Sequence, residues 1–357
     1  MTLQAARSNL AGLRLAWVDY ARGLGIFLVV VGHTLRGVIN ADLLESSATL
    51  RFVDAWIYTF HMPLFFLLSG LFAERSISKG IARFVADKLR TIAYPYVVWS
   101  LLQTIVQLLL SRYTNSTATW WDLVAIVFIP PMQFWFFYAL FLCFLLFLLC
   151  WQAGLGRWGF LGAVIALWVI RSQVGLGSWG VLYSFVANVP YFAIGVFASK
   201  SVQNAMSCAR WQTALTVTVA GYGIVTLFAL SDGGVDGLHR LLPACSGIAA
   251  TLALAALLAR SRVLVWVLHW GEASLPIFVA HTLASAGFRI FLQKLAGVSD
   301  PTTHFVGGLL VGLYGPILLA VLARRAGFDY LFTWPAPAAE VRGASPTALA
   351  LTGTDSK

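Results

Sequence analysis

Apolar stretches long enough to cross a lipid bilayer follow one another along almost all of this 357-residue chain. An α-helix needs about 20 mostly apolar residues to span the hydrocarbon core. Ten stretches approach or exceed that length, at residues 17–38, 52–73, 91–110, 132–151, 158–172, 179–199, 211–231, 240–259, 265–290 and 305–323. Hydrophobic residues make up 59% of the sequence and charged residues only 11%, too few polar side chains to cover a water-soluble fold. The sequence therefore predicts an all-α fold, a polytopic transmembrane helical bundle of about ten spans.

The connections between these stretches are short, so we expect a single transmembrane domain over residues 1–334. Residues 335–357 are rich in Pro, Ala, Ser and Thr, a composition typical of a disordered tail. The first apolar stretch contains charged residues and is not followed by a small-residue cleavage site. We therefore expect it to remain in the protein as a helix.

The positive charges are divided unequally between the two sides of the predicted membrane. If the amino terminus is cytoplasmic, sixteen of the 24 Lys and Arg residues lie in cytoplasmic segments and six on the opposite side. Cytoplasmic loops carry such an excess, so both termini are predicted to lie in the cytoplasm. The basic residues are spread over six cytoplasmic segments rather than gathered in one groove, so nucleic acid is not an expected partner.

Several kinds of chemistry are disfavoured by the motifs that the chain lacks. Its four cysteines form no CxxC pair, so neither a disulfide framework nor a zinc site is expected, and no metal is predicted. There is no P-loop, no HExxH and no G-x-S-x-G sequence. A nucleotide-hydrolysing, zinc-protease or serine-hydrolase mechanism is therefore not indicated.

The first predicted span carries three ionisable side chains, Asp19, Arg22 and His33, each of which is costly in hydrocarbon. Arg22 and His33 are eleven residues apart, which places them on nearly the same helix face and about 16 Å apart along the axis. Asp19 lies three residues before Arg22 and is positioned to pair with it. Such a polar stripe is typical of a helix that faces a bundle interior or a wet cavity.

The second predicted span places another histidine near the middle of the membrane. His61 lies ten residues after Arg51 at the outer end, about 15 Å along the axis, so we expect it to face His33 across a helix pair. Ser69 and Gly70 follow, two small residues that permit close helix contact.

The stretch at 265–290 holds a third histidine of this kind. His281 lies seven residues after Ser274, so the two share a helix face. Pro276 is expected to kink this long helix. A single buried His is more often structural than catalytic, but three imidazoles with an Arg and an Asp in separate spans favour function over packing.

Two further groups of residues are candidates for binding. Arg83, Lys88 and Arg90 form a cytoplasmic basic cluster that suits anionic lipid headgroups or the phosphates of a nucleotide, and an ordinary topogenic loop explains it equally well. Trp135 and Tyr138 are predicted at the extracytoplasmic mouth, where either an interfacial aromatic belt or a ligand platform would place them.

Five of these elements together resemble the acyltransferase type 3 superfamily of integral membrane proteins. Arg22, ten intervening residues and His33, preceded by Asp19, resemble its first-helix motif. FHMPLFFLLSG resembles its second-helix signature, and KLRTIAYPYVVWS resembles its basic-to-aromatic entry into the third helix. FWFFYALF resembles its Trp-Phe element, and SLPIFVAHTL resembles its late helix with Ser and His. The resemblance runs from about residue 14 to residue 325, with the elements in the family's order. Within the superfamily the chain is most similar to the compact fucose 4-O-acetylase-like branch, which includes exopolysaccharide O-acetyltransferases.

This resemblance implies an O-acetyltransferase of the bacterial cytoplasmic (inner) membrane. Acetyl-CoA would bind on the cytoplasmic side, and the acceptor would be a hydroxyl of a polysaccharide or of its lipid-linked oligosaccharide precursor. Membrane lipids and the polysaccharide assembly machinery would be its other partners.

The resemblance also implies roles for the candidate residues. His33 would be the general base, Arg22 would reach the carbonyl or hold the CoA arm, and Asp19 would fix the Arg22 guanidinium. His33 or its surroundings would be supported by His61, His281, Ser274 and Ser69. The CoA phosphates would be bound by Arg83, Lys88 and Arg90. The sugar would be bound by Trp135 and Tyr138. Direct transfer and an acyl-histidine intermediate both remain open.

Two alternatives belong to other classes of protein. A polytopic transporter or flippase could use buried His and Arg residues to carry protons or an anionic substrate, and inverted hydropathy repeats would support it. No convincing inverted repeat is evident in the sequence. A different class of membrane acyltransferase pairs a buried His with an Asn, for which Asn188 is the candidate, but the residues around Asn188 do not resemble that pattern.

Overall fold

The computed structural model describes residues 3–111, 119–173, 180–231 and 238–334, with the side chains of residues 16 onward in these ranges except those of residues 172, 173 and 238. The predicted disordered tail at 335–357 lies outside the described residues. Throughout the described ranges the regular structure is helical, as predicted. The helices are α1 (Leu3–Ile39), α2 (Ala48–Gly70), α3 (Ala73–Ile77), α4 (Ile81–Lys88), α5 (Tyr94–Leu109), α6 (Trp120–Ala125), α7 (Trp135–Gln152), α8 (Gly156–Gln173), α9 (Gly180–Cys208), α10 (Trp211–Leu230), α11 (Leu241–Ser261), α12 (Val265–Glu272), α13 (Ser274–Ile290) and α14 (Pro301–Arg325), with short 3₁₀ or π turns at Leu89–Ala93, Met132–Phe134, Leu238–Arg240, Phe291–Leu295 and Asp329–Leu331.

Nine helical segments in the described part of the chain are long and apolar enough to cross a membrane. They overlap nine of the ten predicted stretches, which confirms the polytopic helical bundle. The other stretch, 158–172, is α8, which is helical but is not one of these nine segments, and which carries Arg157 near its start and Arg171 near its end. The orientation of the bundle remains the prediction from its Lys and Arg residues. We call the end of the bundle where α1 and α8 end the outer end, and the opposite end the inner end.

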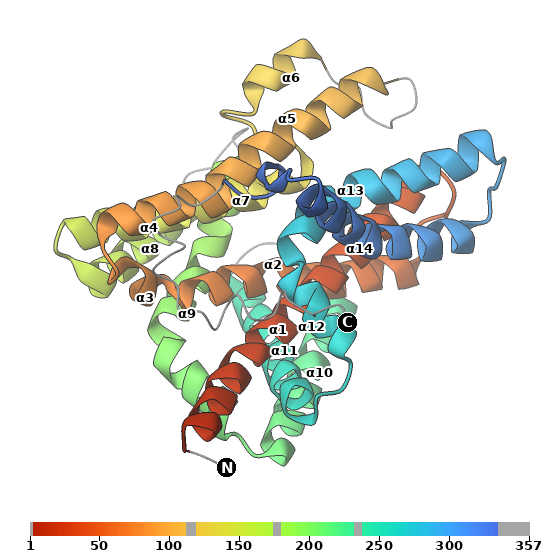
Figure 1. Ribbon diagram of the computed structural model, residues 1–357. Helices are drawn as coiled ribbons and strands as arrows, with labels where there is room; N and C mark the ends of the chain where they lie inside the picture. The colour runs from red at the N-terminus through yellow and green to blue at the C-terminus, as the bar shows by residue number, and fades with distance from the viewer. Residues whose placement is uncertain (1–2, 112–118, 174–179, 232–237, 335–357) are drawn as a thin grey trace, which may run out of the picture.

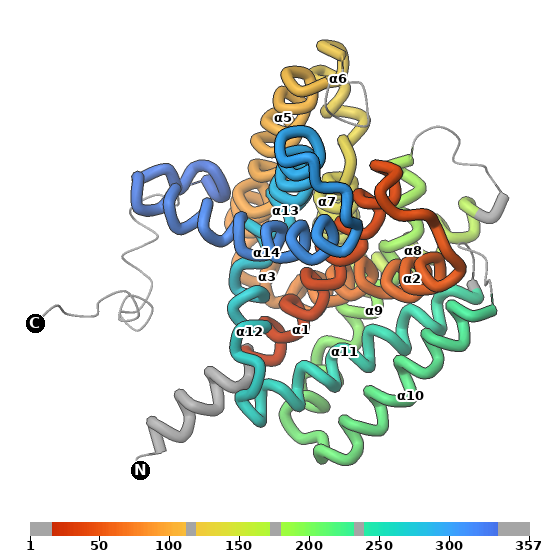
Figure 2. The backbone as a smooth tube through the Cα atoms, turned by 90° about the vertical axis from the view of Figure 1, so that its right-hand side faces the viewer, coloured from red at the N-terminus to blue at the C-terminus, as the bar shows by residue number. Residues whose placement is uncertain are grey.

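The first span occupies the centre of the bundle. It contacts α2, α9, α11, α12, α13 and α14, so helices from both halves of the chain pack around it (Figure 1). On one side α10 and α11 run next to each other, while α5 and α6 project from another side (Figure 2). A polar residue on the inward faces of α1 therefore meets side chains from several distant segments.

Glycines set the closest helix crossings. A Cβ on Gly70 of α2 would collide with the carbonyl oxygen of Phe192 in α9, and one on Gly195 of α9 would collide with the carbonyl oxygen of Leu67. The close contact predicted at Ser69-Gly70 is thus confirmed. The same arrangement joins α1 to α12, because a Cβ on Gly271 would collide with the Asp19 carbonyl oxygen.

The predicted helix at 265–290 is in fact two helices. α12 ends at Glu272 and α13 begins at Ser274, with Ala273 between them at φ −91° and ψ 14°. Pro276 is the third residue of α13, where a backbone N–H has no acceptor within its own helix, so its ring fits there. The prediction of a kink at Pro276 is corrected to a break three residues earlier.

Candidate active site

A cavity of about 480 Å³ opens near the outer end of α1, enclosed by α1, α5, α13 and α14. His33 lines it from α1 and Gln103 from α5. The other polar residues that line it include Thr34, Arg36, Asn40, Gln107, Thr282, Ser285, Arg289 and His304. The cavity therefore combines one of the predicted imidazoles with several hydrogen-bonding groups. We call it the His33 cavity.

His281 lies directly against His33. The ring centroids are 5.1 Å apart and the ring planes are inclined by 62°. Nδ1 of His281 lies 2.8 Å from the carbonyl oxygen of Phe278 and 3.0 Å from that of Ile277. Because a carbonyl oxygen only accepts, Nδ1 carries the hydrogen and Nε2 is left as an acceptor. That Nε2 is buried and has no hydrogen-bond partner among the described residues.

The third histidine approaches the same place through Tyr58. His61 is almost fully buried, and its Nδ1 lies 2.7 Å from the carbonyl oxygen of Ile57. The Tyr58 ring centroid is 4.7 Å from that of His61 and 6.5 Å from that of His33. The predicted proximity of His61 and His33 is therefore mediated by Tyr58. The Tyr58 hydroxyl is buried and has no partner among the described side chains and backbone.

Arg36 lies one helical turn beyond His33 and lines the same cavity, although sequence reasoning counted it only among the outer charges. Its Nε and Nη2 donate to the two carboxylate oxygens of Asp54 at 2.6 and 2.8 Å. Its Cζ lies 3.4 Å from the centroid of the Tyr58 ring. A bidentate carboxylate and a stacked aromatic ring hold the guanidinium in one orientation. The three-residue spacing from His33 was the signal that could have identified it.

A buried amide network includes Gln103 and Thr282, two residues that line the cavity. Gln133 Nε2 donates to Gln103 Oε1 at 3.0 Å and lies 2.8 Å from the hydroxyl oxygen of Thr282. Both glutamines are at most 2% exposed. The network ties α5 and the turn before α7 to α13 next to His281. Sequence reasoning missed these residues because uncharged amides in apolar stretches give no charge signal.

The predicted pair of Asp19 and Arg22 is present, with Arg22 Nη1 3.6 Å from Asp19 Oδ1. The two side chains remain 28% and 43% exposed, respectively, so they are accessible from the inner half of the bundle. Neither residue lines the His33 cavity. The polar residues of α1 thus lie in two separate sites, with Asp19 and Arg22 toward the inner end and His33 in the cavity near the outer end.

A second cavity, of about 270 Å³, lies at the inner end of α2 and contains two of the predicted residues, Ser69 and Lys88. Two basic residues that were not singled out from the sequence, Arg75 and Lys79, also line it. Lys88 Nζ lies 2.7 Å from Asp87 Oδ2 and 4.6 Å from the Phe144 ring centroid. We call this the inner basic cavity.

The other two residues of the predicted basic cluster lie outside this cavity. Arg83 is exposed and Arg90 is half-buried, and neither lines the inner basic cavity. Ser274 is the first residue of α13, on the same helix as His281 but away from the lining of the His33 cavity.

The Phe65 side chain lies on α2 between the depth of the inner basic cavity and the depth of His61. It lies one turn from His61 and one turn from Ser69 on α2. A Cβ on Gly25 of α1 would be 2.9 Å from Phe65 Cζ, and Gly25 lies between Arg22 and His33 in the chain. On α2 the ring lies between Ser69, which lines the inner basic cavity, and His61, and it packs against α1 at Gly25.

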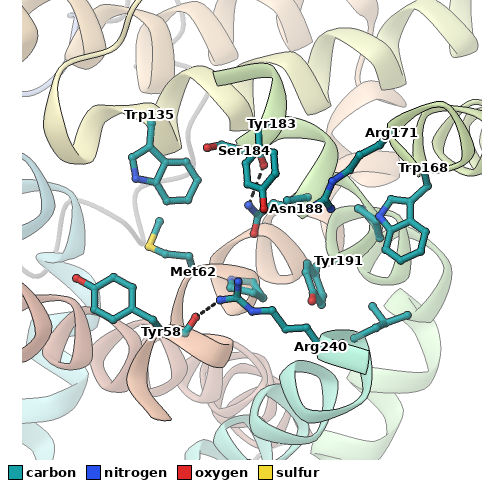
Figure 3. Close-up of a pocket in the computed structure, with 14 residues that line it drawn as sticks. Tyr58, Met62, Trp135, Trp168, Arg171, Tyr183, Ser184, Asn188, Tyr191 and Arg240 are labelled. Carbon is teal, nitrogen blue, oxygen red and sulfur yellow. Dashed lines mark hydrogen bonds between the residues drawn. The ribbon is translucent and has the colours of Figure 1, made fainter. Parts of the chain in front are cut away.

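The two predicted aromatic residues have different surroundings. Trp135 lines a third cavity, of about 180 Å³, at the outer end of the bundle (Figure 3). Tyr138 instead donates to the carbonyl oxygen of Val127 at 3.0 Å and packs edge-on against Tyr96. Asn188 lines the third cavity rather than the His33 cavity, so it is not placed to act with His33. No cluster of three or more potential metal ligands occurs among the described residues.

Comparison with known proteins gives a family match over most of the chain. A family model described as an acyltransferase domain matches residues 15–321. Nodulation protein NolL of Mesorhizobium japonicum is 30% identical over 132 residues, and nodulation protein NolL of Sinorhizobium fredii is 32% identical over 132 residues. Each alignment covers 36% of this chain and 34% of the relative, so the chain matches about a third of the length of these proteins. No solved structure matches the chain.

Proposed function

Because this chain belongs to the acyltransferase type 3 superfamily, we propose that it is a membrane O-acetyltransferase that carries acetyl groups from cytoplasmic acetyl-CoA to a sugar hydroxyl on the outer side. The acceptor is an exopolysaccharide, another surface glycan or the lipid-linked precursor of one. The observation that carries the proposal is the contact between His33 and His281 at a polar outer cavity. Family membership also favours an acyltransferase over the alternative of a transporter.

The reaction needs a base at the outer cavity. A C–O bond forms between the sugar oxygen and the thioester carbonyl carbon, the C–S bond breaks, and CoA leaves as a thiolate that takes up a proton. His33 receives the hydroxyl proton, a role for which an imidazole is suited. A thiolate of pKa about 8.5 is a good enough leaving group that no strong acid is required.

His281 positions this base. Its Nε2 is an acceptor that has no hydrogen-bond partner among the described groups. The His33 ring is the aromatic ring nearest to that of His281, with Phe278 next. We expect one ring nitrogen of His33 to donate to His281 Nε2, which leaves the other nitrogen free to take the hydroxyl proton.

Arg36 is the cation closest in sequence to His33 in the His33 cavity, so we expect it to stabilise the negative charge that develops on the carbonyl oxygen. Asp54 and Tyr58 already hold its guanidinium in place, so little reorganisation is needed as the charge forms. Arg22, deeper toward the cytoplasm and paired with Asp19, then has the role of guiding the donor arm.

The donor enters at the inner basic cavity. Arg75, Lys79 and Lys88 supply cationic donors suited to the phosphates of CoA, and Ser69 lies at the cavity's inward side. From there the acyl arm runs along α2 past Phe65, which swings aside to admit the thioester to His33. Tight packing of Phe65 against Gly25 closes the route when no donor is bound.

Replacing His281 tests the positioning role. His281→Asn keeps a donor near the position of Nδ1 but removes the acceptor at Nε2, and we expect kcat to fall about tenfold, the value of one hydrogen bond. His281→Gln places an amide oxygen near Nε2 and should recover most of the loss, with KM for acetyl-CoA unchanged in both. If the two variants fold in equal amounts but differ in kcat, a purely structural role is contradicted. Equal kcat values in the two variants would contradict the positioning role.

Neutralising the inner basic cavity tests the donor site. The double variant Arg75→Gln/Lys88→Gln should raise KM for acetyl-CoA by at least tenfold, because charge-assisted hydrogen bonds contribute about 1.5–3 kcal/mol each. The value of kcat should stay close to that of the unaltered protein. Arg83→Gln is the matched control, since Arg83 is exposed and outside the cavity. An unchanged KM in the double variant, or an equal rise in the control, would refute this donor site.

The proposed function is tested most broadly by mass spectrometry of surface glycans. A strain that lacks the gene should lose the acetyl mass from one sugar, and the intact gene should restore it. The spectrum also identifies the sugar that carries the group. A glycan profile unchanged by deletion, in a strain that expresses the protein, would contradict a role in glycan acetylation.

A further inference from the structure

The His33 cavity contains a second arginine, Arg289, that has no part in the reaction proposed above. Arg289 belongs to the last turn of α13 and is half-buried. Its Nη1 donates to the carbonyl oxygen of Gly37 at 2.6 Å, so the guanidinium lies against α1. Gly37 is about one helical turn beyond His33, toward the outer end of α1. The Arg289 guanidinium is therefore anchored close to the candidate base.

The positive charge of Arg289 is not balanced by a carboxylate among the described residues. Arg36, the other arginine of the cavity, is paired with Asp54. None of the ion pairs of the described residues includes Arg289, and no Asp or Glu belongs to the described lining of the cavity. A charge that is partly removed from water favours an opposite charge beside it, and a planar guanidinium matches a carboxylate or a phosphate. The cavity therefore offers a position for an anion.

His304 of α14 supplies a hydrogen-bond acceptor to the same cavity. The residue is only 1% exposed, and its Nε2 lies 2.9 Å from the carbonyl oxygen of Val298. Because that oxygen only accepts, Nε2 carries the hydrogen and Nδ1 is left as an acceptor. Nδ1 is buried and has no hydrogen-bond partner among the described residues. Buried polar atoms are nearly always paired, so this nitrogen indicates a bound molecule with a donor, such as a sugar hydroxyl.

The packing of α13 against α14 places Arg289 and His304 at one level of the cavity. The two helices run antiparallel (Figure 1), and the Ser285 hydroxyl of α13 donates to the Gly308 carbonyl oxygen of α14 at 2.9 Å. Arg289 lies one turn after Ser285, and His304 lies one turn before Gly308. Both residues therefore lie one turn beyond this contact, on the side toward the outer end of the bundle.

We propose that Arg289 and His304 form a subsite that selects an acidic sugar, one that carries a carboxylate or a phosphate ester, as the acceptor. Arg289 binds the anionic group, and Nδ1 of His304 accepts from a hydroxyl of the same sugar. The cavity volume of about 480 Å³ lies within the range of about 300–1,000 Å³ that is usual for small-molecule sites, and His33 lines the same cavity. The inference rests on the proposed function in naming a sugar as the acceptor, but sugar binding can be measured without acetyl-CoA.

The test compares the binding of three probes to the full-length protein in nanodiscs of zwitterionic lipid. The probes are methyl glucuronide, methyl glucoside 6-phosphate and the neutral methyl glucoside. One of the two acidic probes should bind about 10- to 100-fold more tightly than the neutral probe, the value of one charge-assisted hydrogen bond. Tighter binding of the glucuronide would identify a carboxylate as the group that is recognised, and tighter binding of the 6-phosphate would identify a phosphate. No preference for either acidic probe would overturn the proposal.

Replacing Arg289 tests the anion position. Arg289→Gln should abolish the preference for the acidic probe, and Arg289→Lys should retain part of it. The readout is the ratio of the affinities for the acidic and neutral probes, because loss of the contact with Gly37 alone would weaken all the probes equally. The matched control is Arg51→Gln, since Arg51 is an exposed outer arginine that also donates to a backbone carbonyl oxygen and does not line the cavity. A ratio that survives Arg289→Gln, or that falls equally in Arg51→Gln, would overturn the proposal.

Replacing His304 tests the acceptor position. His304→Gln keeps a donor near the position of Nε2 and removes the acceptor at Nδ1, so all three probes should bind about two- to tenfold more weakly with the ratio unchanged. His304→Asn places an amide oxygen near Nδ1 and should bind the probes more tightly than His304→Gln. Affinities in His304→Gln equal to those of the unaltered protein would remove His304 from the subsite.

The surface glycan separates this proposal from the proposed function. The acetyl mass lost on deletion of the gene should come from an acidic sugar, and loss from a glycan without acidic sugars would overturn the subsite. An unchanged glycan in the deletion strain, together with binding of an acidic probe that depends on Arg289, would refute the proposed function and leave the subsite standing.

Discussion

Replacing His33 by alanine should lower acetyl transfer by about 10²- to 10⁴-fold, the contribution expected of a well-placed general base. The reason is that a sugar hydroxyl is a weak nucleophile until its proton is accepted. Of the three predicted imidazoles only His33 lines the His33 cavity, where it is joined by His304 of α14, while His281 and His61 are buried and do not line it. The measurement is the rate of acetyl transfer from acetyl-CoA in purified protein, normalised to folded protein.

The control for this variant is His269→Ala. His269 is an exposed histidine of α12 that pairs with Glu272, so its loss should leave transfer unchanged. KM for acetyl-CoA should also be unaffected in His33→Ala, because the inner basic cavity lies at the other end of the bundle. Transfer that survives His33→Ala within tenfold of the unaltered rate would remove His33 from the role of base.

Introducing a side chain at Gly195 should have the largest effect on folding. Any Cβ there meets the backbone carbonyl of Leu67, which cannot move without separating α2 from α9. Overpacking a well-packed site costs about 1–3 kcal/mol even where side chains can adjust, and here backbone must shift. Gly195→Leu should therefore lower the folded fraction of the protein and displace His61 on α2. The measurement is the unfolding midpoint in a denaturing detergent titration.

Gly223→Leu is the matched control, because a Cβ on Gly223 of α10 would meet no atom within 4 Å. The same substitution is thus made at a helical glycine with open space. An unfolding midpoint for Gly195→Leu equal to that of Gly223→Leu would show that the α2–α9 crossing does not depend on a glycine backbone contact.

The helical spans were predictable because their signal is local. Apolar runs and charged boundaries decide where a helix crosses a membrane, and neither depends on the neighbours of that helix. The pairing of Asp19 with Arg22 was predictable for the same reason, since both lie on one helix three residues apart. α8 fell short of the others because arginines at both ends leave little apolar length between them.

The contacts between helices could not be derived from periodicity. Each of His33, His61 and His281 could be assigned a face of its own helix, but their distances depend on crossing angles that Gly70 and Gly195 help to set. The role of Tyr58 between two imidazoles follows from the same geometry.

The break at Ala273 was missed because Pro276 is a strong sequence signal for a kink, whereas no residue at 273 signals the end of a helix. Arg75 and Lys79 were missed for a different reason. They lie on the segment after α2, whereas Arg83 and Arg90 belong to the next cluster along the chain, and only folding shows which of them share a cavity with Lys88.

The central claim is that a donor on the cytoplasmic side and an acceptor on the outer side react at His33, and sided proteoliposomes test it most directly. Radiolabelled acetyl-CoA is supplied only to the inner-end face of the protein, and the sugar acceptor is enclosed on the outer-end face. We predict that label appears on the enclosed sugar with the unaltered protein and not with His33→Ala. Label that reaches sugar only when donor and acceptor share one compartment would contradict the claim.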